Sequence, residues 1–461
     1  MADLSRLRNR ALDLVGKPGT LRGRVARSAS WVTIGYGAEM VLRLGSSLIL
    51  TRLLSPAAFG IMATAQVFLY TAVMLSDVGV RSLVITHERS DAPEFLRTVW
   101  TFQIVRGLIL AAIVALLGQL LGVAQRLGWF SSENSFAEPM LPAIIGVIGI
   151  TLAFEGLKST NEHVMARDLR QDILVKLETG TKILSTFITV GAVWITRSVW
   201  GFVYAALIVA ALRAILSQII VPGPRMQFAW NRDDVSYVIN RGKWIGVSSW
   251  TTLAGSLADK VLIGGFFGSS VLGLYTLALS ITDALHSLIT QVTKAIALPV
   301  LFEMLRANRS DITAAFLRMR NSIMIVSSAI GIALFFAANT LVSIFYDPRY
   351  HDAGSIAAIL SLKYFIFHFD LNMNFIRAKA QFRTAATFNL AGTALLWVVS
   401  VSLAMQEGLT PVLAVLALSP IVERGLASGW MISQGVLTLR VELIYYVIAI
   451  FLSAACLFNL R

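Results

Sequence analysis

The chain alternates long apolar runs with short polar segments, and the clearest example lies between Thr51 and Val80. Ser55 is a good helix N-cap, and Pro56 fits the first turn of a helix, where its missing N–H would have no partner. One apolar helix is therefore expected to end near Leu54 and a second to begin at Pro56. The run from Phe59 to Ser76 has 18 residues without a charge, about the thickness of a bilayer. It predicts a membrane-spanning helix.

The same pattern recurs along the chain and predicts an all-α polytopic membrane protein with about 12 to 14 transmembrane helices. Hydropathy marks thirteen candidate spans, at residues 28–54, 59–80, 98–122, 140–157, 174–195, 199–221, 244–267, 271–301, 321–346, 353–376, 385–405, 410–434 and 441–459. The connecting segments are short. The longest of them leave no room for a catalytic domain outside the membrane.

Composition supports this class, because 56% of the 461 residues are hydrophobic and only 14% are charged, against about 25% charged in an average soluble domain. The net charge of +13 does not indicate nucleic acid, since the cations lie in short loops and not in one patch. Cys456 is the single cysteine, which leaves no disulfide framework and no CxxC metal site. The basic N-terminus lacks an apolar signal segment and predicts a cytoplasmic arm.

Lys and Arg residues are distributed unevenly between the two sides of the predicted bundle. With the N-terminus in the cytoplasm, the cytoplasmic segments hold 25 of them, Arg320 included, and the outer segments hold four. The positive-inside rule therefore fixes this orientation.

A six-span unit is predicted to occur twice. Sliding the chain by 213 residues aligns residues 50–65 with residues 263–278 and places Gly60 on Gly273, with two identities in sixteen positions. Six spans per half would make parallel repeats related by an axis along the membrane normal. The expected organisation is a basic arm at 1–27, six-helix bundles at 28–221 and 244–434, a cytoplasmic linker at 222–243 and an additional helix at 435–461.

Nine basic and seven acidic residues lie in or near the predicted spans. A cation at the centre of a lipid-facing helix costs about 2.5 to 3.5 kcal/mol, so the midspan cations must face partners or water. Such a cavity favours anions, and arginine holds phosphate oxygens with two parallel bonds. The expected substrate-binding residues are Arg43, Arg106, Lys260 and Lys294. The candidate carboxylates for ion coupling are Glu39, Asp259 and Asp283.

Two of these candidates have a structural alternative. Glu39 and Arg43 stand at i and i+4 in the favourable order, so a self-neutralised pair is an equally good interpretation. Asp259 and Lys260 are adjacent, point in different directions on a helix and are expected to have different partners. No phosphate-binding loop, HExxH motif or catalytic triad is present in the sequence, so the pattern predicts neither an enzyme nor a bound cofactor or metal.

Leu54-Ser55-Pro56, followed by Phe59-Gly60 and an apolar helix that closes with Ser76-Asp77-Val78-Gly79-Val80, resembles the N-terminal region of bacterial oligosaccharide flippases. These are the Wzx-like polysaccharide transporter family of the multidrug, oligosaccharidyl-lipid and polysaccharide exporter superfamily. The resemblance implies two six-helix bundles around a central cavity in the bacterial inner membrane. It also implies translocation of an undecaprenyl-pyrophosphate-linked oligosaccharide, with membrane lipids, a polysaccharide polymerase and chain-length regulators as partners.

The sequence thus favours a lipid-linked oligosaccharide flippase that works by alternating access. One alternative is a cation-coupled multidrug and toxin extrusion antiporter, whose activity would depend on carboxylates. Another is a membrane-embedded polysaccharide polymerase or ligase, which would need a sizeable outer loop with catalytic residues. The outer segments, such as residues 125–138 and 346–351, are too small for that role.

Overall fold

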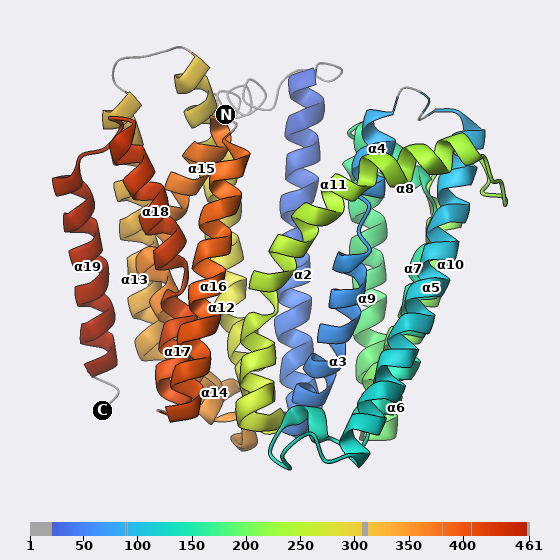
Figure 1. Cartoon of the computed structure of the whole chain (residues 1–461), viewed down its shortest axis with the longest axis horizontal. Helices are drawn as coiled ribbons and strands as arrows, with labels where there is room; N and C mark the ends of the chain where they lie inside the picture. The colour runs from blue at the N-terminus through green and yellow to red at the C-terminus, as the bar shows by residue number, and fades with distance from the viewer. Residues whose placement is uncertain are drawn as a thin grey trace, which may run out of the picture. The chain divides into compact units, whose positions relative to one another are not determined.

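A computed structural model describes residues 21–87, 89, 91–306, 312–379, 381–406 and 408–458. Every regular element in these ranges is a helix (Figure 1), which confirms the all-α class. Most of the predicted basic arm at 1–27 lies outside the described residues.

The first part of the chain forms the helices up to α11. They are α2 (Leu21–Leu53), α3 (Pro56–Leu75), α4 (Val80–Thr86), α5 (Pro93–Arg126), η1 (Ser135–Ala137), α6 (Leu141–Ile148), α7 (Ile150–Gly156), α8 (Asn161–Arg167), α9 (Gln171–Thr196), α10 (Trp200–Ile220) and α11 (Arg232–Ser256).

The second part begins with the longest helix of the described chain, α12 (Ala258–Arg306). It continues with α13 (Ile312–Phe345), η2 (Pro348–Tyr350), α14 (Asp352–Leu360), η3 (Ser361–Phe369), α15 (Asp370–Ala378), α16 (Phe382–Gln406), α17 (Leu409–Leu418), α18 (Pro420–Ser433) and α19 (Leu439–Phe458).

Nine helical segments of the described chain are long and apolar enough to cross a membrane. A tenth is obtained when the bent pair Leu141–Gly156 and Asn161–Arg167 counts as one span. These ten match ten of the thirteen expected spans in position. The three others, at 28–54, 174–195 and 244–267, correspond to the more polar α2 and α9 and to the region where α11 meets α12. The count of thirteen therefore stays a prediction.

Turn chemistry places two of the breaks between helices. α2 ends at Leu53 and α3 starts at Pro56, as the Ser55-Pro56 pair predicts. The break expected after residue 267 lies at Gly268, whose positive φ of 82° interrupts α12 and suits glycine. The expectation of one continuous span over 244–267 was wrong, because α11 ends at Ser256 and α12 begins at Ala258.

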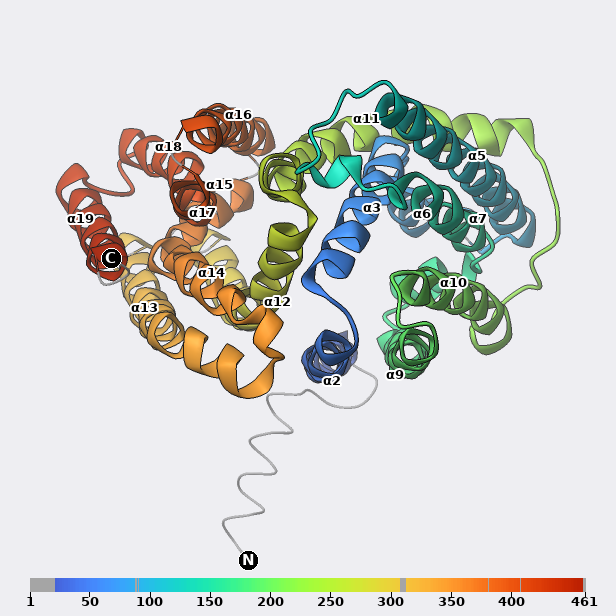
Figure 2. The ribbon, with the colours of Figure 1, turned by 90° about the horizontal axis from the view of Figure 1, so that it is seen from below.

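The chain divides into two compact units. The first unit comprises Met1–Leu53, Phe68–Trp129 and Pro139–Trp250, and the second comprises Leu54–Val67, Phe130–Glu138 and Thr251–Arg461. In the first unit α9 packs against α2 and α10, and α5 packs along α6 and α7 (Figure 2). This packing brings α5, α7 and α8 together around the polar residues described below.

The second unit is built around the segment from α14 to α15. Almost all of its residues between Ile356 and Ile376 are buried, with Tyr364, Phe365 and Phe375 among the largest side chains of the core. Helix α13 packs along α14 and η3, and α16 packs against α17 and α18 (Figure 2). The central segment is therefore shielded from lipid by its neighbours.

Candidate functional site

A cavity of about 300 Å³ lies within the first unit, among α3, α5, α7 and α8. One wall of the cavity is polar and carries cationic, anionic and neutral side chains, and the other wall is apolar and smaller. The polar wall consists of Gln103, Arg106, Glu155, Lys158, Ser159, Glu162 and His163, and the apolar wall of Val73, Gly107, Leu110, Leu152 and Gly156.

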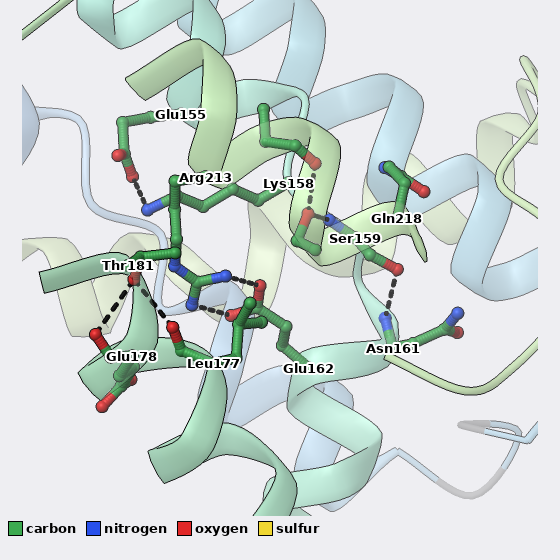
Figure 3. Close-up of polar contacts among 12 residues, drawn as sticks. Glu155, Lys158, Ser159, Asn161, Glu162, Leu177, Glu178, Thr181, Arg213 and Gln218 are labelled. Atoms are coloured by element: carbon green, nitrogen blue, oxygen red, sulfur yellow. Dashed lines mark hydrogen bonds and ion pairs between the residues drawn. The ribbon is translucent and has the colours of Figure 1, made fainter. Parts of the chain in front are cut away.

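The sharp corner between α7 and α8 positions the charged residues of the cavity. The two helices meet at 61°, and their connection is held from two neighbouring helices. The carbonyl of Leu157 accepts hydrogen bonds from Trp100 Nε1 of α5 at 3.2 Å and from Gln218 Nε2 of α10 at 2.7 Å. The backbone N–H of Ser159 donates to Ser217 Oγ of α10 at 3.0 Å. The corner is therefore held by α5 and α10, and Figure 3 shows Ser159 and Gln218 beside it.

Two glycines bring α5 and α7 into backbone contact at the floor of the cavity. A Cβ on Gly107 would lie 2.6 Å from the carbonyl oxygen of Leu152, and a Cβ on Gly156 would lie 2.5 Å from that of Gln103. Small residues allow such close helix crossings in membranes. No side chain from these two positions fills the cavity.

Two ion pairs neutralise most of the charge around the cavity. Lys158 pairs with Glu155, and Arg213 of α10 holds Glu162 with two parallel bonds of 2.8 and 3.0 Å (Figure 3). The Arg213 and Glu162 side chains are only 12% and 16% exposed. Because each of these charges has an opposite partner, they do not set the net charge of the cavity.

Arg106 is the cation of the cavity that has no ion-pair partner among the described residues, and the Asp77 carboxylate acts on it only from a longer distance. Its guanidinium donates to Ser76 Oγ at 3.1 and 3.3 Å and to the carbonyl of Val73 at 3.3 Å. Both acceptors are neutral. Among the ion pairs of the described residues none involves Arg106, although its side chain is half-buried. A half-buried arginine with neutral partners gives the cavity a positive charge that suits an anionic ligand.

The other predicted residues of the first unit lie on α2. Glu39 forms an ion pair with Lys182 of α9, and Arg43 is exposed. Glu39 therefore has a partner on another helix, which sequence reasoning missed. Arg43 is not among the residues that line the cavity.

The predicted residues of the second unit lie on α12. Asp259 accepts a hydrogen bond of 2.8 Å from Tyr275 and stands 3.9 Å from Lys260, so its close partner is the tyrosine. Asp283 pairs with Lys363 of η3 at 2.6 Å. The Lys294 side chain lies outside the described residues. That Arg43, Arg106, Lys260 and Lys294 form one substrate site stays a prediction.

Sequence reasoning also missed a buried ion pair in the second unit. Arg320, assigned to a cytoplasmic loop from the sequence, lies in α13 with a side chain that is 0% exposed, and it pairs with Glu442 of α19, which is 2% exposed. Its guanidinium stacks over the Tyr445 ring at 3.8 Å. The hydropathy boundary at 321 concealed this position, because the helix begins at Ile312.

The fold and the cavity together define a multi-pass α-helical membrane protein. The chain belongs to the polysaccharide biosynthesis protein family, whose model matches residues 49–355. The flippase resemblance of the segment from Leu54 to Val80 is thereby confirmed.

Two relatives have related names. The teichuronic acid biosynthesis protein TuaB of Bacillus subtilis (strain 168) is 21% identical over 293 residues, which are 63% of this chain and 58% of TuaB. The lipopolysaccharide biosynthesis protein WzxC of Escherichia coli (strain K12) is 19% identical over 348 residues, 74% of this chain and 67% of WzxC. The chain thus spans less than two thirds of the length of TuaB.

Solved structures share the architecture over almost the whole chain. The lipid II flippase MurJ in an inward closed conformation superposes with a TM-score of 0.68 at 10% identity, covering 92% of this chain and 97% of MurJ. A MATE protein in complex with MaL6 gives 0.55 at 13% identity, covering 89% of this chain and 95% of that protein. At these identities the similarity shows the fold alone.

Proposed function

We propose that this protein is a flippase that moves a lipid-linked oligosaccharide across the bacterial inner membrane by alternating access. Its family and the names of TuaB and WzxC support a role in making a surface polysaccharide. The shared fold with the lipid II flippase MurJ supports a substrate that is attached to a lipid. The substrate in this proposal is an oligosaccharide on undecaprenyl pyrophosphate.

The observation that carries the proposal is the environment of Arg106. A lipid-linked oligosaccharide offers one strongly anionic group, its diphosphate, and a flippase must hold this group away from bulk water. Arg106 provides a half-buried cation whose own partners are the neutral oxygens of Ser76 and Val73. A phosphate oxygen can therefore bind it without displacing a carboxylate.

The orientation and the partners belong to the same proposal. An excess of Lys and Arg in the predicted cytoplasmic loops supports a cytoplasmic N-terminus, which would place the corner between α7 and α8 near the side where the substrate is loaded. A polysaccharide polymerase and chain-length regulators would then receive the substrate on the outer side. The protein acts in this scheme as a transporter and not as an enzyme.

Complementation of a deletion strain tests this function. Wild-type protein should restore the surface polymer, whereas Arg106→Gln should lower its output and make lipid-linked units accumulate on the cytoplasmic side. Loss of one charge-assisted hydrogen bond costs about 1.5 to 3 kcal/mol, which is about 10- to 150-fold in binding. Arg106→Lys should retain part of the activity, because it keeps the charge but loses the planar fork.

Arg126→Gln is the matched control, since Arg126 lies in the last turn of the same helix and is exposed. Normal polymer output from Arg106→Gln would contradict the role of this arginine. Normal output from the deletion strain would contradict the function itself. Drug resistance in place of polymer export would favour the antiporter alternative, and polymer-length defects with normal flipping would favour the polymerase or ligase alternative.

A further inference from the structure

Gln103 lies one helical turn before Arg106 on α5, and both side chains line the same cavity. The Gln103 Oε1 atom is buried and has no hydrogen-bond partner among the described residues. Leaving a buried acceptor without a donor costs free energy, so such atoms in folded proteins mark the place of a missing donor. The cavity thus contains the Arg106 cation, which hydrogen-bonds to neutral oxygens, and one helical turn away the Gln103 acceptor, which has no hydrogen-bond donor among the described residues.

We propose that this cavity is a subsite for the sugar-phosphate junction of the lipid-linked glycan. Arg106 binds the phosphate, and Gln103 Oε1 accepts a hydrogen bond from a hydroxyl or acetamido N–H of the first sugar. This assignment rests on the proposed flippase function and names the part of the substrate that the first unit recognises.

The spacing of the two side chains fits this ligand. Residues three positions apart on a helix lie on one face, with Cβ atoms about 5 to 6 Å apart. In a sugar 1-phosphate, the substituent on the neighbouring ring carbon projects beside the phosphate and carries a hydroxyl or acetamido donor. One ligand can therefore reach the guanidinium and the amide oxygen together, whereas inorganic phosphate reaches only the guanidinium.

The apolar wall of the cavity fits a single sugar ring. Gly107 and Gly156 contribute only backbone, and Leu110 and Leu152 provide a hydrocarbon surface for the C–H face of the ring. A volume of about 300 Å³ is at the lower end of small-molecule sites. It holds one ring and one phosphate, so the remaining sugars must extend out of the cavity.

Binding of soluble fragments to the purified full-length protein in lipid nanodiscs tests the subsite. Isothermal titration calorimetry would compare N-acetylglucosamine 1-phosphate and glucose 1-phosphate with inorganic phosphate and free glucose. The wild-type protein should bind at least one sugar phosphate about tenfold more tightly than inorganic phosphate, the gain expected of one additional hydrogen bond. Free glucose should bind most weakly, because it does not engage Arg106.

Variants separate the two contacts. Gln103→Leu should reduce sugar-phosphate affinity to the level of inorganic phosphate while leaving phosphate affinity unchanged, and Gln103→Met provides a second variant without the acceptor. Arg106→Gln should weaken both ligands. Gln119→Leu is the matched control, because Gln119 is exposed on the same helix and lies outside the cavity.

Equal affinities of the wild-type protein for sugar phosphates and inorganic phosphate would overturn the subsite. So would sugar-phosphate binding that both Gln103 variants retain, or phosphate binding that falls together with sugar-phosphate binding in them. Each of these results leaves the flippase function standing, because that function is judged by polymer output and by the sidedness of lipid-linked units in the deletion strain.

Discussion

Gly60 of α3 lies directly against the backbone of Ser269 in α12, so that a Cβ on Gly60 would stand 1.8 Å from the Ser269 carbonyl oxygen. The reciprocal contact is also present, since a Cβ on Gly273 would stand 1.8 Å from the carbonyl oxygen of Pro56. All four residues belong to the second unit. The two helices therefore touch backbone to backbone at this crossing.

The residues of the two contacts are related by the same shift of 213 residues that aligns the two halves of the sequence. Pro56 and Ser269 are 213 residues apart, and so are Gly60 and Gly273. In each contact, a glycine of one helix lies against the carbonyl four residues before the glycine of the other helix. A local two-fold axis between the helices produces this reciprocal arrangement. The weak alignment of residues 50–65 with 263–278 thus has a structural counterpart, while a repeat of six helices beyond this crossing stays a prediction.

Gly60→Ala and Gly273→Ala should each destabilise the protein, because the added methyl group would collide with a carbonyl and force the helices apart. Overpacking of this kind costs about 1 to 3 kcal/mol. The loss in the double variant should be smaller than the sum of the two single losses, since both substitutions open one crossing. Thermal unfolding of the purified protein in detergent would measure these effects.

Gly191→Ala is the control for this series. Gly191 lies within α9, and a Cβ there would meet nothing within 4 Å; alanine is also the better helix former. The variant should unfold at or above the wild-type temperature. A Gly60→Ala protein as stable as the wild type would contradict the close contact.

Glu442→Ala should be among the most destabilising single substitutions of the second unit. It leaves the Arg320 guanidinium buried without its carboxylate, and breaking a buried pair in this way costs about 3 to 5 kcal/mol. The double variant Arg320→Met, Glu442→Leu should recover most of this loss, because it removes both charges. Unfolding temperatures of the single and double variants would test this.

Asp91→Ala provides the comparison, since Asp91 is exposed and pairs with Arg167 at the surface of the first unit. Surface pairs contribute about 0 to 1 kcal/mol, so its unfolding temperature should stay close to that of the wild type. Equal losses for Glu442→Ala and Asp91→Ala would show that burial does not govern the Arg320–Glu442 pair.

The sequence predicted those features that depend on neighbouring residues. Ser55 and Pro56 predicted a helix start, and the gap expected between the spans 244–267 and 271–301 contains Gly268, whose positive φ interrupts α12. Hydropathy located the apolar runs, since lipid imposes length and composition on each helix separately. The break between Ser256 and Ala258 was missed, because Asp259 and Lys260 beside it were interpreted as charges within one continuous span.

The partners of the charged residues depend on contacts between distant helices, and the sequence predicted them poorly. Arg320 and Glu442 are 122 positions apart, and Glu162 and Arg213 are 51 apart. Arg106 was singled out because an intramembrane cation is costly, and it does line a cavity. Gln103 carries no charge and was not predicted. A polar residue one helical turn from an intramembrane arginine is the signal that could have identified it.

Asp283→Asn tests whether this carboxylate carries the coupling ion. In proteoliposomes under an imposed sodium or proton gradient, the variant should flip substrate at a rate that no longer depends on the gradient. Lys363→Met should lower the ion concentration needed for the half-maximal rate, because Asp283 then loses the ammonium that stands 2.6 Å from it. If Asp283→Asn still depends on the gradient, Asp283 does not carry the coupling ion. The same measurement on Glu39→Gln and Asp259→Asn would then test the other two candidates.

Glu162 and Arg213 offer a pair of substitutions with equal effects on stability and opposite effects on ligand binding. Each removes one side of a bidentate pair that is mostly buried, so Glu162→Gln and Arg213→Gln should both lower the free energy of unfolding by about 1.5 to 3 kcal/mol. Glu162 lines the cavity that holds Arg106. Its loss should make the cavity more positive and strengthen binding of inorganic phosphate.

Arg213→Gln should weaken phosphate binding instead, because the Glu162 carboxylate then stands in the cavity without its counter-ion and repels the anion. Calorimetry with inorganic phosphate, together with thermal unfolding of the same preparations, would separate the two quantities. Phosphate affinities that change in the same direction in both variants would mean that the anion does not bind near Arg106. The opposite changes would place it there, because only a ligand within reach of the Glu162 charge responds to its sign.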